Sequence, residues 1–259
     1  MLEVIDKGFC TESHPIPLVF VHGGFHGAWC WDEHFLDFFA DKGYRALALS
    51  LRGHGASSET KPLNDCSIAD YVNDVASIAD RLPAPPVVIG HSMGGFIVQK
   101  YLESHEAPAA VLMGSVPPSG SSRQIRRFTV RHPWLQARAL VTHRSSHCFK
   151  TPKRARYWLF SPGTPEPDVT RFAARIQEES ARAISGMLRN LPQPQHITTP
   201  VLVMGGEHDG SVTRDEMRAT ALAYRTEEEV FPGMGHNMML EPGWAAVAER
   251  IHSWLENNT

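Results

Sequence analysis

The feature that most constrains this sequence is an apolar run, residues 87–89, which ends abruptly in the Gly-x-Ser-x-Gly pentapeptide of residues 90–94. The run is rich in β-branched residues and predicts a buried strand, whereas the apolar residues after the pentapeptide recur at helical spacing. A serine between such a strand and such a helix predicts a nucleophile elbow, a turn tight enough to strain the backbone of Ser92. The same turn would place the amide N–H of Met93 at a helix N-terminus, where it can face a developing anion.

Composition narrows the class of protein. The 259 residues permit one large α/β domain or two small ones, and the formal net charge of −3 indicates neither a nucleic-acid partner nor a strongly acidic one. No apolar run is long enough for a membrane span, and the N-terminus lacks a basic-then-apolar signal region. The four cysteines are scattered, which favours reduced thiols in a cytoplasmic protein.

Strand and helix patterns alternate along most of the chain. Mainly apolar runs predict strands at residues 16–21, 44–51, 87–89, 109–113 and 200–204, and we interpret residues 227–231 as a last strand at a sheet edge. Helical patterns fall between them at residues 28–39, 68–82, 93–102 and 213–224, and a closing helix covers residues 244–255. This alternation predicts an α/β fold with a mostly parallel, twisted sheet and helices on both faces.

The pattern changes after Pro118, where Lys and Arg recur and no Asp or Glu lies between Glu106 and Glu166. We interpret residues 117–195 as a mainly helical cap insertion, with a helix expected over residues 169–188. The insertion divides the core into residues 1–116 and 196–259. The basic residues favour either a solvated helix face or a pocket entrance that attracts anionic groups such as carboxylates or phosphates.

Three chemically useful side chains follow predicted strands. In a parallel sheet the ligand site lies beyond the carboxyl ends of the strands, so Ser92, Asp209 and His236 are expected to meet there. His236 would be the base that activates the Ser92 hydroxyl, and Asp209 would orient the imidazole. Glu207 is a rival for the acid. A glycine-rich turn with an incidental serine gives the same pentapeptide, but the order Ser, Asp, His favours the triad.

The loop that follows the first predicted strand, His22-Gly23-Gly24, can direct backbone N–H groups at a ligand. We expect the N–H groups of Gly24 and Met93 to form an oxyanion hole, and His22 to shape the loop rather than titrate. The tight histidine groupings, His22 with His26 and His208 with its acidic neighbours, lack a metal-ligand pattern. With no phosphate-binding or dinucleotide fingerprint either, the sequence predicts no metal and no cofactor.

These residues together resemble the α/β-hydrolase superfamily over nearly the whole chain outside the insertion. The motifs that carry the resemblance are His22-Gly23-Gly24, Arg52-Gly53-His54-Gly55, Gly90-His91-Ser92-Met93-Gly94-Gly95, Gly206-Glu207-His208-Asp209 and Gly235-His236. Residues 22–31 are similar to the oxyanion segment of small esterases related to plant methylesterases and hydroxynitrile lyases. The lyases carry a lysine directly after the catalytic histidine, and Asn237 stands in that place here. Dehalogenases and epoxide hydrolases of this fold need an aspartate in place of Ser92.

The resemblance implies a carboxylesterase-like enzyme that hydrolyses a small ester through an acyl-enzyme on Ser92. Thioester, lactone or carbon–carbon bond hydrolysis with the same triad remain alternatives, as does a small-molecule receptor that keeps the fold without turnover. The sequence leaves the natural substrate and the oligomeric state open.

Overall fold

The computed structural model describes residues 1–58 and 61–259. Within them, seven strands form one sheet in the order β1-β3-β2-β4-β5-β6-β7. The strands are β1 (Val4–Lys7), β2 (Leu18–Val21), β3 (Ala46–Leu49), β4 (Val87–His91), β5 (Ala110–Met113), β6 (Val201–Gly206) and β7 (Glu228–Phe231). Strand β1 pairs antiparallel with β3, and every other pairing is parallel. The predicted mostly parallel sheet is therefore confirmed.

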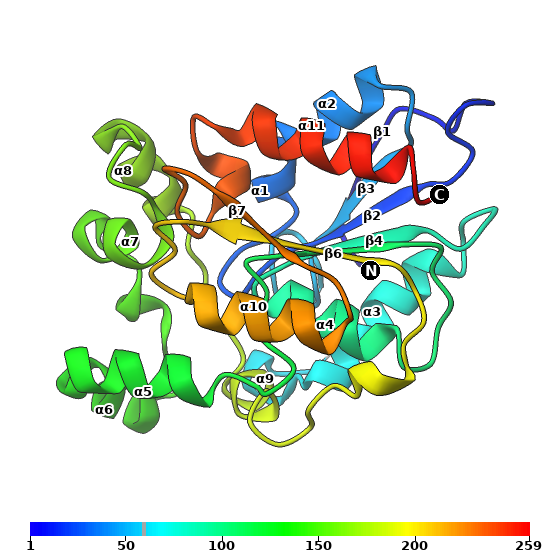
Figure 1. Ribbon diagram of the computed structural model, residues 1–259. Coiled ribbons are helices and arrows are strands. Elements are labelled where there is room, and N and C mark those ends of the chain that lie inside the picture. The colour runs from blue at the N-terminus through cyan, green and yellow to red at the C-terminus, as the bar shows by residue number, and fades with distance from the viewer. Residues whose placement is uncertain (59–60) are drawn as a thin grey trace.

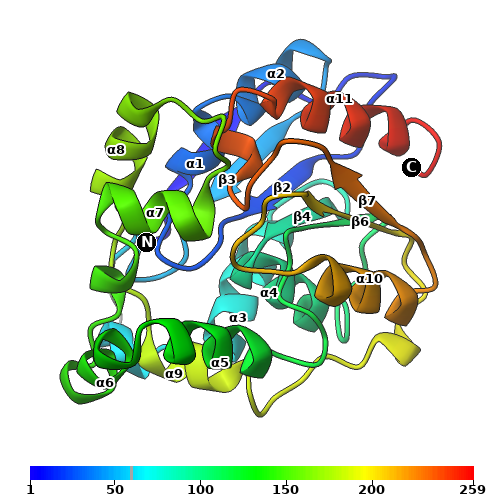
Figure 2. The same cartoon turned by 60° about the vertical axis from the view of Figure 1, so that its left-hand side comes forward.

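Helices cover both faces of the sheet (Figures 1 and 2). On one face lie α1 (Trp29–Asp32), α2 (Phe35–Asp41) and α11 (Trp244–Leu255), and on the other lie α3 (Ile68–Ala79), α4 (Met93–Tyr101) and α10 (Arg214–Ala223). The central strands β2, β4 and β5 are buried on both faces, which explains their continuous apolar sequences. No helix among the described residues is both long and apolar enough to cross a bilayer.

Two helices begin where their capping residues predict. Ser67 caps α3 and Thr213 caps α10, and each forms a capping box with the acidic residue three positions on. The hydroxyl oxygen accepts the backbone N–H of that residue, while the carboxylate accepts the backbone N–H of the cap. These reciprocal bonds fix the start of both helices.

The structure differs from the sequence predictions in three places. Strand β1 was not predicted, because it is four residues long, half-buried and half polar. The helix expected over residues 28–39 is interrupted at His34, whose φ of −150° leaves the helical region. The helix expected over residues 169–188 is two helices, α8 (Glu166–Ala174) and α9 (Ala181–Gly186), separated by a stretch that contacts the candidate site.

Five helices lie between β5 and β6 in the chain: α5 (Ser122–Arg131), α6 (Pro133–Thr142), α7 (Pro152–Leu159), α8 and α9. In both ribbon views, α5 to α8 stand together at one side of the sheet. Short 3₁₀ helices occur at Leu63–Asp65, Ser146–Cys148, Pro194–His196 and Met238–Leu240. The helical content of the insertion is as predicted, and its division as a cap of residues 117–195 stays a prediction.

Candidate active site

The turn between β4 and α4 has the geometry expected of a nucleophile elbow. Ser92 has φ 53° and ψ −117°, and residues other than glycine rarely adopt such a positive φ. A Cβ at Gly90 would lie 2.5 Å from the carbonyl oxygen of Gly94. A Cβ at Gly94 would lie 2.3 Å from the carbonyl oxygen of Val21. The turn therefore admits no side chain at either glycine.

Asp209 and His236 are brought together at the same edge of the sheet. Asp209 Oδ2 lies 2.7 Å from His236 Nδ1, and both side chains are 3% exposed. The other carboxylate oxygen accepts the backbone N–H groups of Ser211 and Val212, each at 2.7 Å, which fixes the carboxylate plane. A carboxylate held in this way keeps the proton of a neutral imidazole on Nδ1 and leaves Nε2 as the basic nitrogen.

Ser92 and His236 line one cavity, although no hydrogen bond between their side chains is present among the described residues. Apolar side chains supply most of the cavity wall. The lining residues are Gly24, Phe25, His26, His91, Ser92, Met93, Val116, Gln124, Phe149, Leu159, Glu179, Ile184, Met187, Ser211 and His236. As far as the chain is described, this lining includes one carboxylate and no Lys or Arg, so the cavity holds no Lys or Arg side chain to pair with a charged substituent of the substrate.

Two backbone donors beside Ser92 have no acceptor. The N–H groups of Gly24 and Met93 take part in no hydrogen bond of the described residues. Met93 is the first residue of α4, where backbone N–H groups have no intrahelical partner. A Cβ built on Gly24 would be 3.9 Å from the Met93 side chain, so the two residues are neighbours. Both belong to the cavity wall, and their role as an oxyanion hole stays a prediction.

Two neutral histidines hold the loop of residues 22–27. His22 Nδ1 donates to the carbonyl of Gly23 at 2.8 Å, and its Nε2 accepts the N–H of Leu51 at 3.0 Å. His26 Nδ1 donates to the carbonyl of Gly24 at 2.8 Å. Burial lowers the pKa of His22 to about 3 and the pKa of His26 to about 4. His22 is therefore tied to the loop backbone in the neutral form, as expected.

His91, the residue before the elbow serine, has a role that the sequence analysis missed. Its Nε2 lies 3.0 Å from the main-chain carbonyl oxygen of His236. Burial holds the pKa of His91 well below its ordinary value, so the ring is neutral and donates from Nε2. The elbow is thereby tied to the turn that carries His236. The Gly-x-Ser-x-Gly pattern allows any residue at this position, so no sequence signal pointed to the role of His91.

Glu179 is a second residue that the sequence analysis missed. Its side chain is 1% exposed, and it accepts the hydroxyl of Tyr71 at 2.9 Å and the backbone N–H of Phe25 at 3.3 Å. It also lies 3.1 Å from Nε2 of the buried His54, in an ion pair. Burial alone would raise the pKa of Glu179, but His54 and the hydrogen bonds from Ser180 and Tyr71 together hold that pKa below its usual range. A carboxylate from the insertion thus holds Phe25, whose φ of 69° is left-handed, beside Gly24.

The rival acid, Glu207, is excluded by its position. Its side chain is 55% exposed and accepts the backbone N–H of Gly233 at 2.9 Å, away from His236. Asn237 is fully buried, and its amide Nδ2 donates to Nε2 of His26 at 3.1 Å. In this chain the residue after His236 therefore supports the loop of residues 22–27 and presents no cation to the cavity.

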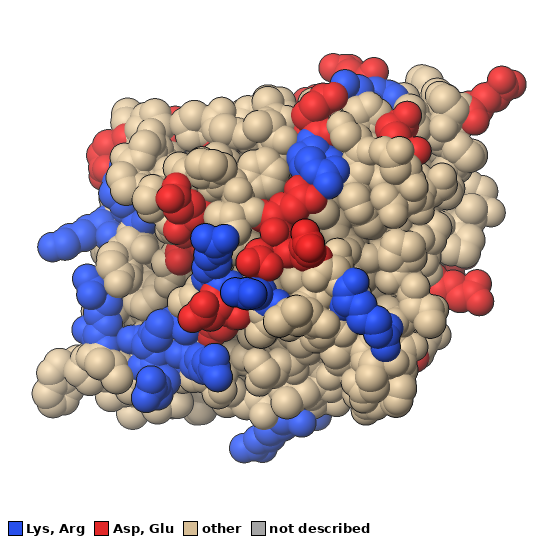
Figure 3. Space-filling model, in the orientation of Figure 1, with Lys and Arg blue, Asp and Glu red and all other residues tan. Residues whose placement is uncertain are grey.

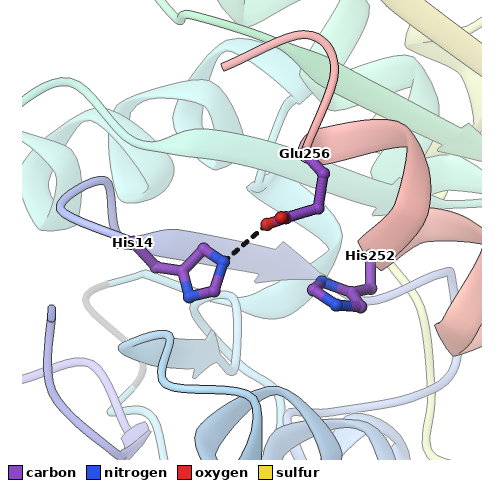
Figure 4. A group of neighbouring side chains, drawn as sticks. All are labelled: His14, His252 and Glu256. Carbon is purple, nitrogen blue, oxygen red and sulfur yellow. Dashed lines mark hydrogen bonds and ion pairs between the residues drawn. The ribbon is translucent and has the colours of Figure 1, made fainter. Parts of the chain in front are cut away.

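A group of potential metal ligands lies elsewhere, where the segment before β2 meets α11 (Figure 4). It consists of His14, His252 and Glu256, and the sequence analysis did not single it out. His14 Nε2 is 2.6 Å from Glu256 Oε1, and Tyr44 OH is 3.2 Å from both His252 Nδ1 and Glu256 Oε1. Two ligands of a tetrahedral zinc ion stand about 3.3 Å apart. The spacing here is that of a hydrogen-bonded cluster, and it gives no reason to place a metal.

Comparison with known proteins identifies what this geometry resembles. The sequence profile of the alpha/beta hydrolase family matches residues 18–250. A non-heme haloperoxidase of Rhodococcus erythropolis is 28% identical, and the bifunctional esterase/perhydrolase DCH of Acinetobacter calcoaceticus is 35% identical. Each match covers 86% of both chains. Methylesterase 10 of Arabidopsis thaliana is 31% identical over 37% of this chain and 41% of its own. Among solved structures, a thermophilic esterase from Thermogutta terrifontis superimposes with a TM-score of 0.75 at 20% identity, covering 100% of this chain and 94% of that one, which shows the shared fold.

Proposed function

Because the chain belongs to the alpha/beta hydrolase family, we propose that it is a serine hydrolase that cleaves small carboxylic esters through an acyl-enzyme on Ser92. One observation carries the proposal: a serine held at φ 53° on a strand–helix turn lines the same cavity as a histidine bonded to a buried aspartate. The name of the 35% identical esterase/perhydrolase supports it.

In the proposed mechanism His236 is the general base. Nε2 takes the proton of the Ser92 hydroxyl as the oxygen attacks the ester carbonyl carbon, and Asp209 stabilises the imidazolium that forms. The tetrahedral intermediate collapses, the carbon–oxygen bond to the alcohol breaks, and His236 returns the proton to the leaving alcohol. Water, deprotonated in turn by His236, then attacks the carbonyl carbon of the acyl-enzyme. The bond from that carbon to the Ser92 oxygen breaks, His236 returns the proton to Ser92, and the carboxylic acid is released.

The two free N–H groups of Gly24 and Met93 would receive the oxyanion of both tetrahedral intermediates. Each donor of this kind contributes roughly 3 kcal/mol of transition-state stabilisation. The peptide unit that carries the Gly24 N–H is held by the bond from His22 to the Gly23 carbonyl. The next peptide unit is held by His26 at the Gly24 carbonyl and by Glu179 at the Phe25 N–H, so the Gly24 N–H is oriented before the substrate arrives. Such preorganisation avoids a reorganisation cost during the reaction.

The cavity favours an uncharged acyl group. Phe149, Leu159 and Met187 are among the apolar side chains that line it, and Glu179 would repel an anionic substituent. We therefore assign the carboxylesterase class with neutral acyl esters as substrates. The earlier hypothesis of an anionic substrate stays a prediction for groups that remain outside the cavity.

The direct test is turnover of p-nitrophenyl esters of increasing acyl length, beside labelling with a fluorophosphonate. We expect steady hydrolysis by the wild type, a fall of several orders of magnitude in kcat for Ser92→Ala, and a single phosphonylated residue, Ser92, by mass spectrometry. Ser122→Ala, which removes an exposed hydroxyl of α5, is the matched control. Ligand-dependent stabilisation without product would indicate a receptor instead.

Perhydrolysis is a second candidate, because that 35% identical relative is described as both an esterase and a perhydrolase. In that reaction hydrogen peroxide takes the place of water at the acyl-enzyme and yields a peracid. Peracid formation from acetate ester and peroxide, lost in Ser92→Ala, would support it. Thioesters and lactones in the same panel test the remaining substrate classes.

A further inference from the structure

Helices α5 and α6 carry a concentration of exposed apolar side chains. Val130 is 78% exposed, Trp134 is 87%, Leu140 is 67% and Val141 is 81%. Helix α6 contains no buried residue. Exposing several large apolar groups on one short hairpin is costly in water and marks an interaction surface. We call the exposed residues of segment 123–153 the α5–α6 surface.

The same surface is strongly basic. Seven cations are exposed on it: Arg123, Arg126, Arg131, Arg138, Arg144, Lys150 and Lys153. Figure 3 shows Lys and Arg gathered over the part of the molecule that Figure 1 labels α5, with an uncharged protrusion beside them. The segment contributes no acid of its own, since no Asp or Glu lies between residues 106 and 166.

Acidic groups of neighbouring elements neutralise little of this charge. Glu178 faces Arg144 at 3.5 Å, and Glu216 and Glu166 pair with the less exposed Arg127 and Arg156. The other six exposed cations take part in no ion pair of the described residues. The surface therefore combines unpaired positive charge with exposed apolar side chains.

The α5–α6 surface lies on the outside of a wall of the candidate site. Gln124 of α5 lines the cavity, and Phe128 of the same helix packs against Phe149, which also lines it, with ring centroids 5.8 Å apart. One side of α5 thus faces the cavity while the other carries Arg123 and Arg126. A partner bound to this surface would sit close to the cavity.

We propose that the α5–α6 surface docks on an anionic lipid membrane. Trp134 and the aliphatic side chains would enter the interfacial region, while the arginines and lysines contact lipid phosphates and extend their charges toward them. A nucleic-acid backbone would use the charges but offer nothing to Val130, Leu140 and Val141. A second copy in a two-fold dimer would place positive charge against positive charge.

Vesicle co-sedimentation tests the proposal without any turnover, so it does not depend on the proposed hydrolysis. The probes are vesicles of phosphatidylcholine alone and of phosphatidylcholine with phosphatidylglycerol. We expect binding to the mixed vesicles only, weakened by salt. Trp134→Ser/Val141→Ser removes apolar contact, and Arg123→Gln/Arg138→Gln removes charge. Because each cation near such a surface is worth about fivefold in partitioning, removing the two arginines should lower binding about twenty-five-fold.

Matched controls lie on α10, where Leu222 is 68% exposed and Arg218 is also exposed. Leu222→Ser and Arg218→Gln should bind vesicles as the wild type does. Equal binding to neutral and anionic vesicles, or wild-type binding by both surface variants, would overturn the proposal. So would a dimer that Trp134→Ser disrupts, or tight binding to duplex DNA that only the arginine changes weaken, since these results would assign the surface to another occupant.

Discussion

The imidazole of His91 donates a hydrogen bond from Nε2 to the main-chain carbonyl oxygen of His236, 3.0 Å away. The neighbour of the proposed nucleophile therefore holds the backbone of the proposed base. The two rings also lie close, with centroids 4.6 Å apart. The side chains of Ser92 and His236 share no hydrogen bond among the described residues, and the bond from His91 links the elbow directly to the turn that carries His236.

Replacing His91 should lower the rate more than the affinity for substrate. His91→Leu fills the buried position with an apolar side chain but leaves the His236 carbonyl without its donor. The turn that carries His236 is then free to shift. A displacement of about 1 Å can cost on the order of a hundredfold in rate. We expect kcat to fall tenfold to a hundredfold with KM within about threefold. Steady-state kinetics and a thermal melt measure both effects, and an unchanged kcat in a folded variant would contradict this role.

Asp209→Asn should be nearly inactive although it is isosteric. An amide in that place presents a donor or a neutral acceptor to Nδ1, which disturbs the tautomer and removes the charge that stabilises the imidazolium. The loss expected is about 10⁴-fold in kcat. Glu207→Gln is the control, because the Glu207 side chain is exposed and bonded to Gly233. If Glu207→Gln lost as much activity as Asp209→Asn, the assignment of the acid would be wrong.

The backbone around the elbow gives a prediction about stability. A Cβ on Gly94 would lie 2.3 Å from the Val21 carbonyl oxygen, whereas a Cβ on Gly24 meets nothing closer than 3.5 Å. Gly94→Ala must therefore displace β2 from the turn and should cost at least about 2 kcal/mol of unfolding free energy. Gly24→Ala should keep its stability within about 1 kcal/mol. Chemical denaturation of the two variants provides the comparison, and equal losses would contradict it.

The sequence was sufficient to predict the elbow, the sheet and the edge position of the three proposed catalytic residues. Each of these follows from local patterns: a β-branched run, a glycine pair or a polar loop after a strand. Strand β1 was missed because Val4–Lys7 is short and half polar, and it is stabilised by pairing with β3, which lies about forty residues away in the chain.

For a related reason, the residues that position the site could not be predicted from the sequence. His91 and Glu179 act through partners 145 and 154 residues away, and no local pattern shows such pairings. The break between α8 and α9 has the same origin, because the N–H of Gln177 donates to Phe25 O and the Glu179 carboxylate accepts from Phe25. Tertiary contacts there outweigh helical propensity.

The lowered pKa of His26 predicts that the folded protein loses stability in acid. Its folded pKa, about 4, lies below the ordinary 6.5, so between these values the unfolded chain binds more protons than the folded one. Stability must therefore fall as the pH drops through this window, by about 2 kcal/mol from pH 7 to pH 5 for this residue alone. His26→Asn should lose that share of the pH dependence. Urea denaturation at both values measures it, and an unchanged slope would show that His26 is protonated in the folded protein.

The Glu179–His54 ion pair predicts a contribution to fold stability that is largest in mildly acidic solution, where the contribution of His26 is falling. Burial lowers the pKa of His54, but the Glu179 carboxylate outweighs burial and raises it above 6.5, while the pKa of Glu179 is held below 4.5. A raised histidine pKa stabilises the fold below pH 6.5 and loses this effect as the pH rises through the folded value. A lowered glutamate pKa stabilises it above pH 4.5 and loses this effect on acidification. The pair is therefore complete near pH 5.5.

Glu179→Gln should cost most near that pH and less at pH 9. Removing one partner of a buried ion pair costs about 3 kcal/mol where both are charged, because the other is left without compensation. The difference in unfolding free energy between wild type and variant, measured in urea at pH 5.5 and pH 9, is the readout.

Since Glu179 also holds the N–H of Phe25 beside Gly24, kcat of Glu179→Gln should fall about tenfold at both pH values. Tyr71→Phe, which removes a neutral donor from the same carboxylate, should lower stability without this pH dependence. A pH-independent loss in Glu179→Gln would show that the pair is not ionised.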